Sequence, residues 1–177
     1  MAFANPARSV EQLDLAPGMH VADFGAGAGY LAIEAAERVG EDGRVYVIDL
    51  QQELLTKATH LAEEHHLGTL TFIHADIEAE RGSTLEDGSV DAVLISNLLF
   101  QAQHKEGVLA EAHRILRPQG MLLVVDWRES FGGMGPQPEH ILPEDDTRTL
   151  AKQAGFKHKK DIDAGAYHYG LIFTKHG

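Results

Sequence analysis

The sequence predicts a single Rossmann-like α/β domain with a doubly wound, mostly parallel sheet and an antiparallel last strand. Short apolar runs alternate with longer helical patterns along the chain, as right-handed strand–helix–strand crossovers require. Several of these runs are almost continuously apolar, which is typical of central strands covered on both faces. The last two β-like segments are separated only by Ala164-Gly165-Ala166, and so short a joint requires an antiparallel hairpin.

The elements are expected in a regular order along the chain. Strands are predicted at 20–24, 44–49, 69–74, 90–96, 120–126, 157–163 and 167–175. Helices are predicted around 31–39, 54–62, 109–116 and 144–154. Ser9-Val10-Glu11-Gln12 indicates a capping box on a short leading helix. Arg117-Pro118-Gln119-Gly120 indicates a turn before the fifth strand.

Composition and charge exclude several classes of protein. Apolar residues make up 44% of the chain, but no apolar run approaches the roughly 20 residues that cross a bilayer. The absence of cysteine excludes disulfides, zinc–thiolate sites and thiol nucleophiles. The N-terminus does not have the features of a signal peptide, so the cytoplasm is the expected location. A net charge of −12 makes nucleic-acid binding unexpected.

A glycine loop follows the first predicted strand. The segment Asp23-Phe24-Gly25-Ala26-Gly27-Ala28-Gly29 ends an apolar run and opens a helical pattern. Alternating glycines permit a tight turn and a close approach to a ligand, and the helix N-terminus offers free N–H donors. Nicotinamide and flavin sites use similar loops, but the spacing here is G-x-G-x-G. Asp23 would also sit badly beside a pyrophosphate, whereas it suits an ammonium or sulfonium group.

Two further carboxylates follow predicted strands. Asp49 closes the second strand, where a carboxylate can accept hydrogen bonds from both hydroxyls of a ribose, and Asp76 follows the third strand. Each of them alone is more often a helix cap than a ligand-binding residue. Together with the glycine loop they lie at the carboxyl ends of strands, where open α/β sheets bind ligands. The combined pattern therefore predicts a binding site.

Five segments together make the sequence resemble the class I S-adenosylmethionine-dependent methyltransferases, particularly the small-molecule and quinone-type branch. They are the glycine loop 23–29, Val47-Ile48-Asp49, His74-Ala75-Asp76-Ile77, 90–97 and the stretch 111–120. The resemblance covers nearly the whole chain. It implies seven strands with an antiparallel last one, S-adenosylmethionine as cofactor, and methyl transfer to a small molecule as activity.

The resemblance also implies contacts residue by residue. The loop of Gly25, Ala26, Gly27 and Gly29 would back the methionine part of the cofactor, with Asp23 near its amino group and Asn97 beside the methionine moiety. Asp49 would hold the ribose, Leu50 would pack on the adenine, Asp76 would accept from the adenine amino group, and the Ile77 N–H would bond the ring. Leu98 and Phe100 fit either core or pocket.

No catalytic residue stands out in the sequence. Methyl transfer depends mainly on in-line positioning, and a base is needed only where the acceptor loses a proton. Asp126, His140 and His168 are the candidates, although a structural or surface role competes for each. The other histidines have no ligand spacing with a carboxylate, so no metal is predicted.

The domain is expected to span 1–177, with 1–16 as a short N-terminal cap and 131–143 as a loop on the substrate side. Phe3 and Arg8 are the residues left to close the site. So short a cap leaves the acceptor pocket open, or completed by the partner subunit of a homodimer. Arsenite is disfavoured as acceptor, because family members that methylate it hold it with thiols.

Two alternative functions stay open. One is a non-catalytic S-adenosylmethionine-binding module. The other is a nicotinamide-dependent oxidoreductase on a similar sheet, against which Asp23 and the terminal hairpin argue.

Overall fold

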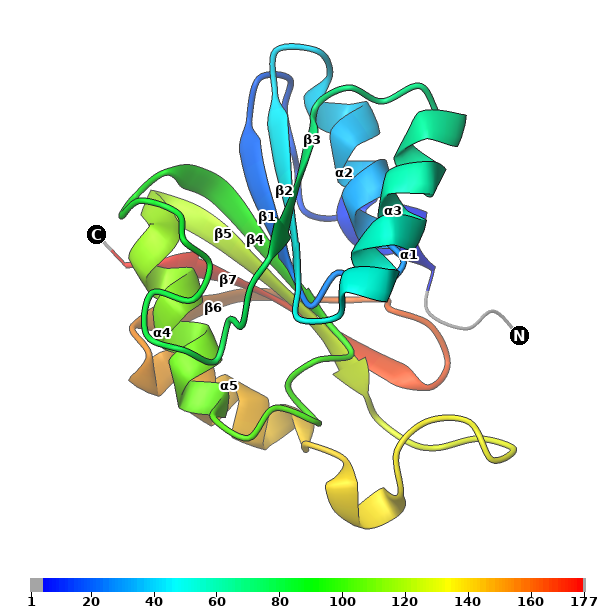
Figure 1. The fold of residues 1–177 in the computed structure, drawn as a ribbon. Helices are drawn as coiled ribbons and strands as arrows, with labels where there is room; N and C mark the ends of the chain where they lie inside the picture. The colour runs from blue at the N-terminus through cyan, green and yellow to red at the C-terminus, as the bar shows by residue number, and fades with distance from the viewer. Residues whose placement is uncertain (1–4, 177) are drawn as a thin grey trace.

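A seven-stranded sheet runs through the middle of the protein. The computed structural model describes residues 5–176. The strands are β1 (His20–Phe24), β2 (Arg44–Asp49), β3 (Leu70–His74), β4 (Val90–Ser96), β5 (Leu116–Trp127), β6 (Phe156–Ile162) and β7 (His168–Lys175). Their order is β3-β2-β1-β4-β5-β7-β6 (Figure 1). The first five are parallel and β7 is antiparallel to β5 and β6, which confirms the predicted fold class.

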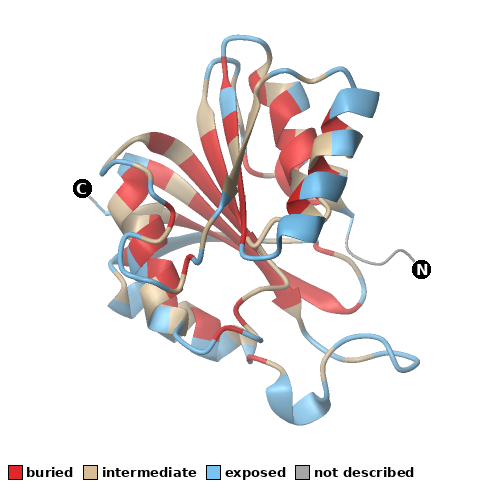
Figure 2. Cartoon of the chain, viewed as in Figure 1, coloured by how far each residue is buried: buried red, intermediate tan, exposed pale blue. Residues whose placement is uncertain are grey.

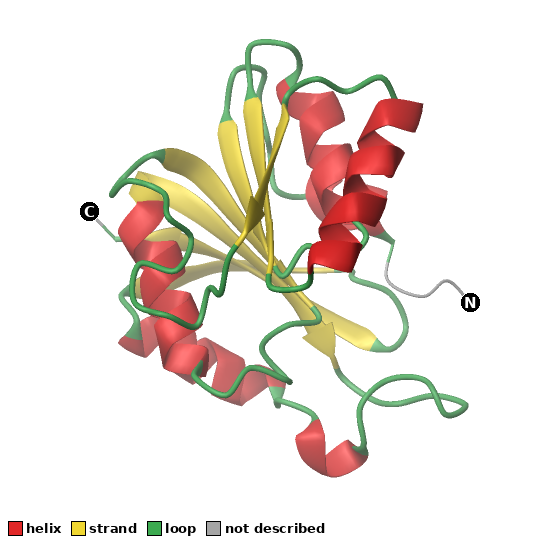
Figure 3. Ribbon diagram, in the orientation of Figure 1, coloured by secondary structure: helices red, strands yellow, loops and turns green. Residues whose placement is uncertain are grey.

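Helices cover both faces of this sheet (Figure 3). The helices α1 (Pro6–Glu11), α2 (Tyr30–Val39) and α3 (Gln52–Glu64) pack on one face. The helices α4 (Lys105–Ile115) and α5 (Glu144–Gln153) pack on the other, and a 3₁₀ turn, η1, covers Pro138–His140. Within residues 5–176, no helix has both the length and the apolar character of a membrane span.

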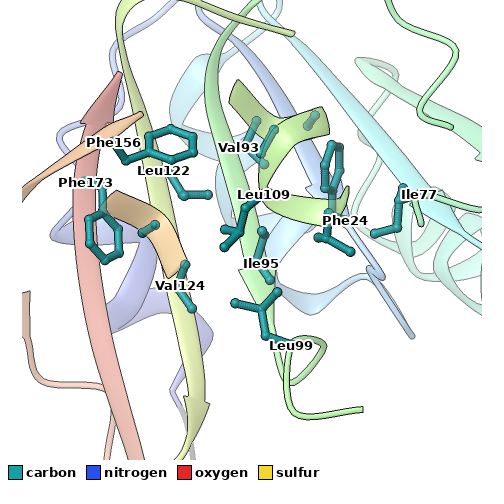
Figure 4. Close-up of a cluster of buried hydrophobic side chains, with 14 of the residues drawn as sticks. Phe24, Ile77, Val93, Ile95, Leu99, Leu109, Leu122, Val124, Phe156 and Phe173 are labelled. Atoms are coloured by element: carbon teal, nitrogen blue, oxygen red, sulfur yellow. The ribbon is translucent and has the colours of Figure 1, made fainter. Parts of the chain in front are cut away.

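The central strands are buried because helices lie on both of their faces (Figure 2). On the α4 side, Phe24 of β1, Ile95 of β4 and Val124 of β5 pack with Leu109 of α4 in one apolar cluster (Figure 4). Each such side chain contributes about 1.5–3 kcal/mol through burial. This packing fixes the strand ends, from which the functional residues project.

Two expectations about local structure are wrong. The leading helix begins at Pro6 with Asn5 as its N-cap, whose Oδ1 accepts the Arg8 N–H, so Ser9 lies inside the helix and is buried. Asn caps strongly and Pro fits the first helical position, which explains the earlier start. The segment 117–120 lies within β5 and does not precede it, and the pairing with β4 shifts there, since Leu116 pairs with Val90 and Met121 with Ala92.

Candidate functional site

A cleft of about 540 Å³ opens at the carboxyl ends of β1, β2, β3 and β4. Parallel strands end at one edge of a sheet, which brings together residues that are far apart in sequence. The walls of the cleft come from the glycine loop and from the segments that follow β2, β3 and β4. All of the predicted cofactor-binding residues except Gly29 line it: Asp23, Gly25, Ala26, Gly27, Asp49, Leu50, Asp76, Ile77 and Asn97.

The glycine loop turns the chain from β1 into α2. The N–H groups of Gly25 and Ala26 both donate to the Ile48 carbonyl, at 2.9 and 3.1 Å, which ties the loop to the end of β2. Gly29 is the N-cap of α2 with a φ of 85°, and a Cβ there would lie 2.8 Å from the Cβ of Ala58 in α3. Gly29 therefore allows α2 to approach α3 and does not form part of the cleft wall.

Asp49 fixes two backbone segments beside the cleft. Its buried carboxylate accepts the Gly27 N–H at 2.9 Å through Oδ2 and the Gln51 N–H at 2.8 Å through Oδ1. Because each carboxylate oxygen has two lone pairs, both can accept a further hydrogen bond from a ligand. Asp49 thus shapes the glycine loop and the start of α3 while still facing the cleft.

Asp23 and Asn97 bring unpaired polar atoms to the cleft. Asp23 Oδ2 and Asn97 Oδ1 are buried and have no hydrogen-bond partner. Burial, together with the negative charge of Asp49, raises the pKa of Asp23 to about 8 against the opposing effect of the Ala32 N–H. Unpaired buried polar groups are costly, so both residues fit a site that is completed by a polar, positively charged ligand.

The far end of the cleft combines an apolar surface with backbone turns. Leu50 is 62% exposed although it is a large apolar residue, and its carbonyl lies 2.8 Å from His74 Nε2. Asp76 Oδ1 accepts the Glu78 N–H at 2.9 Å, which shapes the turn that contains Ile77. An exposed leucine beside such a turn can cover the face of a flat ring.

Sequence reasoning missed other residues of the cleft. Tyr30 lines it and is 62% exposed. Its position directly after the glycine loop is the signal that could have identified it. Leu98, which fitted either core or pocket, lines the cleft and also packs against the core, whereas Phe100 packs against the core without lining the cleft. The remaining lining residues include Pro6, Leu31, Gln51, Leu54, Ala75, Glu78, Ser96 and Gln101.

The three catalytic candidates do not line the cleft. Asp126 is fully buried, and His140 is exposed in η1. His168 is buried with both ring nitrogens unpartnered, and its ring centroid lies 4.2 Å from that of Trp127. In the part of the chain that the structure describes, no group of three or more His, Cys, Asp or Glu residues could hold a metal.

The N-terminal cap differs in detail from the expectation. Arg8 forms an ion pair with Asp163, 2.7 Å between Nη2 and Oδ2, and does not line the cleft. Pro6 takes part in the wall instead. Phe3 lies outside the described residues.

The family of the chain follows from comparison with known proteins. The model of a methyltransferase domain family matches residues 15–164. The chain belongs to this family. A solved S-adenosylmethionine-dependent methyltransferase from Aquifex aeolicus is similar to this methyltransferase domain, with a TM-score of 0.86 and 25% identity. The similarity covers 97% of this chain and 90% of that one. Family and fold are those of the class I methyltransferases, whose cofactor is S-adenosylmethionine.

Curated relatives extend beyond this methyltransferase domain. An arsenite methyltransferase of Aquipseudomonas alcaligenes is 34% identical over 116 residues, which are 63% of this chain and 34% of the relative. The ubiquinone/menaquinone biosynthesis C-methyltransferase UbiE of Hydrogenovibrio crunogenus is 31% identical over 120 residues, 67% of this chain and 46% of the relative. The chain therefore spans between a third and a half of the length of these two relatives.

Proposed function

We propose that this protein transfers the methyl group of S-adenosylmethionine to a small, neutral or cationic organic acceptor. The observation that supports this most is the pair of unpartnered buried atoms in the cleft, Asp23 Oδ2 and Asn97 Oδ1. The amino-acid end of the cofactor offers the charged donors that these atoms lack, so binding would remove the cost of leaving them unpaired.

Each wall of the cleft has a role in this proposal. Asp23 and Asn97 pair with the amino-acid end, Asp49 accepts from the ribose hydroxyls, and Leu50 covers the adenine, while Asp76 and Ile77 bond its edge. When bound, the cofactor supplies a methyl group that the sulfonium charge has already activated. The chain then needs to hold an acceptor in line and exclude water, and such positioning can be worth about 7–11 kcal/mol.

Charge and composition restrict the acceptor. The described residues that line the cleft include four acids, Asp23, Asp49, Asp76 and Glu78, and no Lys, Arg or His. An anionic acceptor that approached the cofactor from the acceptor side would be disfavoured by the negative field of these acids. Arsenite, the acceptor in the name of one relative, is disfavoured because the chain has no cysteine to hold it. We assign the acceptor side to the loop 131–143 and the cap 1–16.

Calorimetry tests the cofactor assignment. We expect S-adenosylhomocysteine to bind and NADH not to bind. Asp49→Ala should weaken S-adenosylhomocysteine binding by roughly 1–3 kcal/mol, because hydrogen bonds to a charged group are lost. Asp42→Ala is a matched control, since Asp42 is exposed in the turn between α2 and β2. Binding of NADH alone, or an unchanged affinity in Asp49→Ala, would contradict the assignment.

The second candidate function is a non-catalytic S-adenosylmethionine-binding module. It is favoured by one observation, that Asp126, His140 and His168 all lie outside the cleft lining. Turnover of the cofactor with a panel of phenol, amine and thiol acceptors separates the two functions. Methylation of any of them contradicts the module.

The proposal also includes the location and the partners of the protein. We propose a cytoplasmic protein that acts on a small molecule without nucleic acid. Sedimentation at micromolar concentration distinguishes a monomer from a homodimer that would complete the acceptor pocket.

A further inference from the structure

Asp126 is a buried carboxylate that lies near the cleft without lining it. It is the second-last residue of β5. Its Oδ2 accepts the Phe100 N–H at 3.1 Å, and its Oδ1 accepts the N–H of Trp127, the next residue in the chain, at 2.8 Å. The Leu99 N–H also stabilises its charged form. The carboxylate therefore holds the loop that follows β4 against the end of β5.

That loop forms one wall of the cleft. Asn97, Leu98 and Gln101 line the cleft, while Leu99 between them is buried in the core (Figure 4). Asn97 has a left-handed backbone with a φ of 53°, which a residue other than glycine keeps only where its surroundings hold it. Its N–H donates to Val125 O at 2.9 Å, so β5 holds both ends of this short segment.

Leu98 connects the same loop to the glycine loop. A Cβ built on Gly25 would lie 2.9 Å from Leu98 Cδ1, so the leucine side chain packs directly on the Gly25 backbone. A shift of the segment 97–101 would therefore move Leu98 and loosen the wall that Gly25 forms.

We propose that Asp126 is a positioning residue, which fixes the segment 97–101 and, through Leu98, the glycine loop, and so sets the affinity of the cleft for its cofactor. It acts through backbone N–H groups and not by contact with a ligand. This role replaces the catalytic one that its place at a strand end suggested. It rests on the proposed function only for the choice of ligand in the test.

The protonation state of Asp126 gives this role a measurable signature. Burial raises the pKa of Asp126 to about 6, against its backbone hydrogen bonds and the charge of Lys105 on α4. Asp126 pairs with Tyr169 of the neighbouring strand β7. Burial and the negative charges of Asp126 and of Glu144 and Asp146 on α5 raise the pKa of Tyr169. A proton on either carboxylate oxygen would face an N–H donor, so a hydrogen bond to the backbone weakens as the pH falls below about 6.

The test is calorimetric titration of S-adenosylhomocysteine into wild type and Asp126→Asn between pH 5 and pH 7.5. Asparagine has the same shape as aspartate, but its NH₂ group is a hydrogen-bond donor and cannot accept from a backbone N–H. We expect affinity about 10- to 150-fold lower in the variant at pH 7.5, as for one lost hydrogen bond to a charged group. Wild-type affinity should fall toward the variant's as the pH drops, with a step near pH 6 that the variant lacks. A pH-dependent step in affinity that a histidine or Asp23 causes would appear in both the wild type and Asp126→Asn.

Asp91→Asn is the matched control. Asp91 also lies on a strand and accepts a backbone N–H, that of His20 at 2.8 Å, but at the opposite edge of the sheet. It should leave the affinity unchanged. Trp127 is the only tryptophan in the chain, and its N–H donates to Asp126. If Asp126→Asn does not fold, tryptophan emission and affinity should still change together near pH 6 in His168→Gln, which lacks the imidazole that lies against Trp127.

Two results would overturn the inference. One is equal S-adenosylhomocysteine affinity in wild type and folded Asp126→Asn at every pH. The other is a wild-type affinity without a step near pH 6. Both leave the proposed function intact. A wild type that binds no S-adenosylhomocysteine at all would overturn the proposed function, and this inference with it.

Discussion

Asp23 is the second-last residue of β1 and is 1% exposed, with one carboxylate oxygen unpaired. Burial and the negative charge of Asp49 raise its pKa to about 8, so at neutral pH the free protein keeps a proton there. A cationic ligand beside it would favour the charged form and displace that proton. We therefore expect the carboxylate of Asp23 to lower the stability of the free protein as the pH rises and to strengthen the binding of a cationic ligand.

Asp23→Asn should separate these two effects. Because the folded-state pKa lies above the unfolded value, the wild type loses stability as the pH rises from about 4 to about 8. The uncharged variant avoids that loss. We expect it to be more stable than wild type at pH 8 by roughly 1–3 kcal/mol, with a smaller difference at pH 5, and to bind S-adenosylmethionine more weakly.

Urea unfolding at both pH values and calorimetry measure these quantities. Asp42→Asn, at an exposed turn position, should show neither effect. A variant that gains no stability relative to wild type between pH 5 and pH 8 would contradict the assignment of the raised pKa to Asp23.

At the scale of elements, close backbone contacts set the position of the helices around the glycine loop. Gly29 begins α2 where a Cβ would meet Ala58 of α3 at 2.8 Å. Asp49 holds the Gly27 N–H on one side of this junction and the Gln51 N–H at the start of α3 on the other. The shape of the cleft thus depends on how closely α2 and α3 approach.

Gly29→Ala should destabilise the protein through both backbone strain and this contact. We expect a loss of roughly 2–4 kcal/mol, and partial recovery when Ala58→Gly is added, since that change removes the contact but not the strain at a φ of 85°. Gly18→Ala is the matched control, because Gly18 has nearly the same φ, 83°, but no atom near its absent Cβ.

Urea denaturation of the two single variants, Ala58→Gly and the double variant gives the coupling free energy. A cost in Gly29→Ala equal to that in Gly18→Ala, with no coupling to Ala58→Gly, would show that the helix contact is unimportant.

At the scale of the whole molecule, the net negative charge should affect how strongly charged ligands are attracted to the cleft. The chain carries a net charge of −12, and the cleft itself is lined by acids. Such a field attracts cations and is screened by salt over about 10 Å at 0.1 M. S-adenosylmethionine carries one more positive charge than S-adenosylhomocysteine, so the two ligands probe the field separately.

We therefore expect a difference in salt dependence between these ligands. The affinity for S-adenosylmethionine should fall several-fold when salt rises from about 0.03 to 0.3 M, because screening weakens the attraction. The affinity for S-adenosylhomocysteine should change little. Calorimetry at both salt concentrations measures the two slopes, and equal slopes would show that the acids of the cleft do not select by charge.

The fold and most residues of the cleft lining could be predicted from sequence because their signals are local. Apolar runs marked the strands, the short joint at 164–166 required the antiparallel hairpin, and strand ends marked Asp49 and Asp76. A parallel sheet then brings such ends to one edge without further information. Local signals also failed where two of them competed, as at Asn5 and Ser9, since one helix takes only one N-cap.

Tertiary structure alone decided what each residue does within that frame. Asp23, Asp49 and Asp126 all lie within the last two residues of their strands, yet Asp23 has an unpaired oxygen, Asp49 ties two loops together and Asp126 lies behind the cleft wall. Leu98 and Tyr30 belong to the cleft only because the loops that carry them fold over the sheet edge. Hydrogen-bond partners and burial depend on contacts between distant segments, and these do not appear in the local pattern of residues.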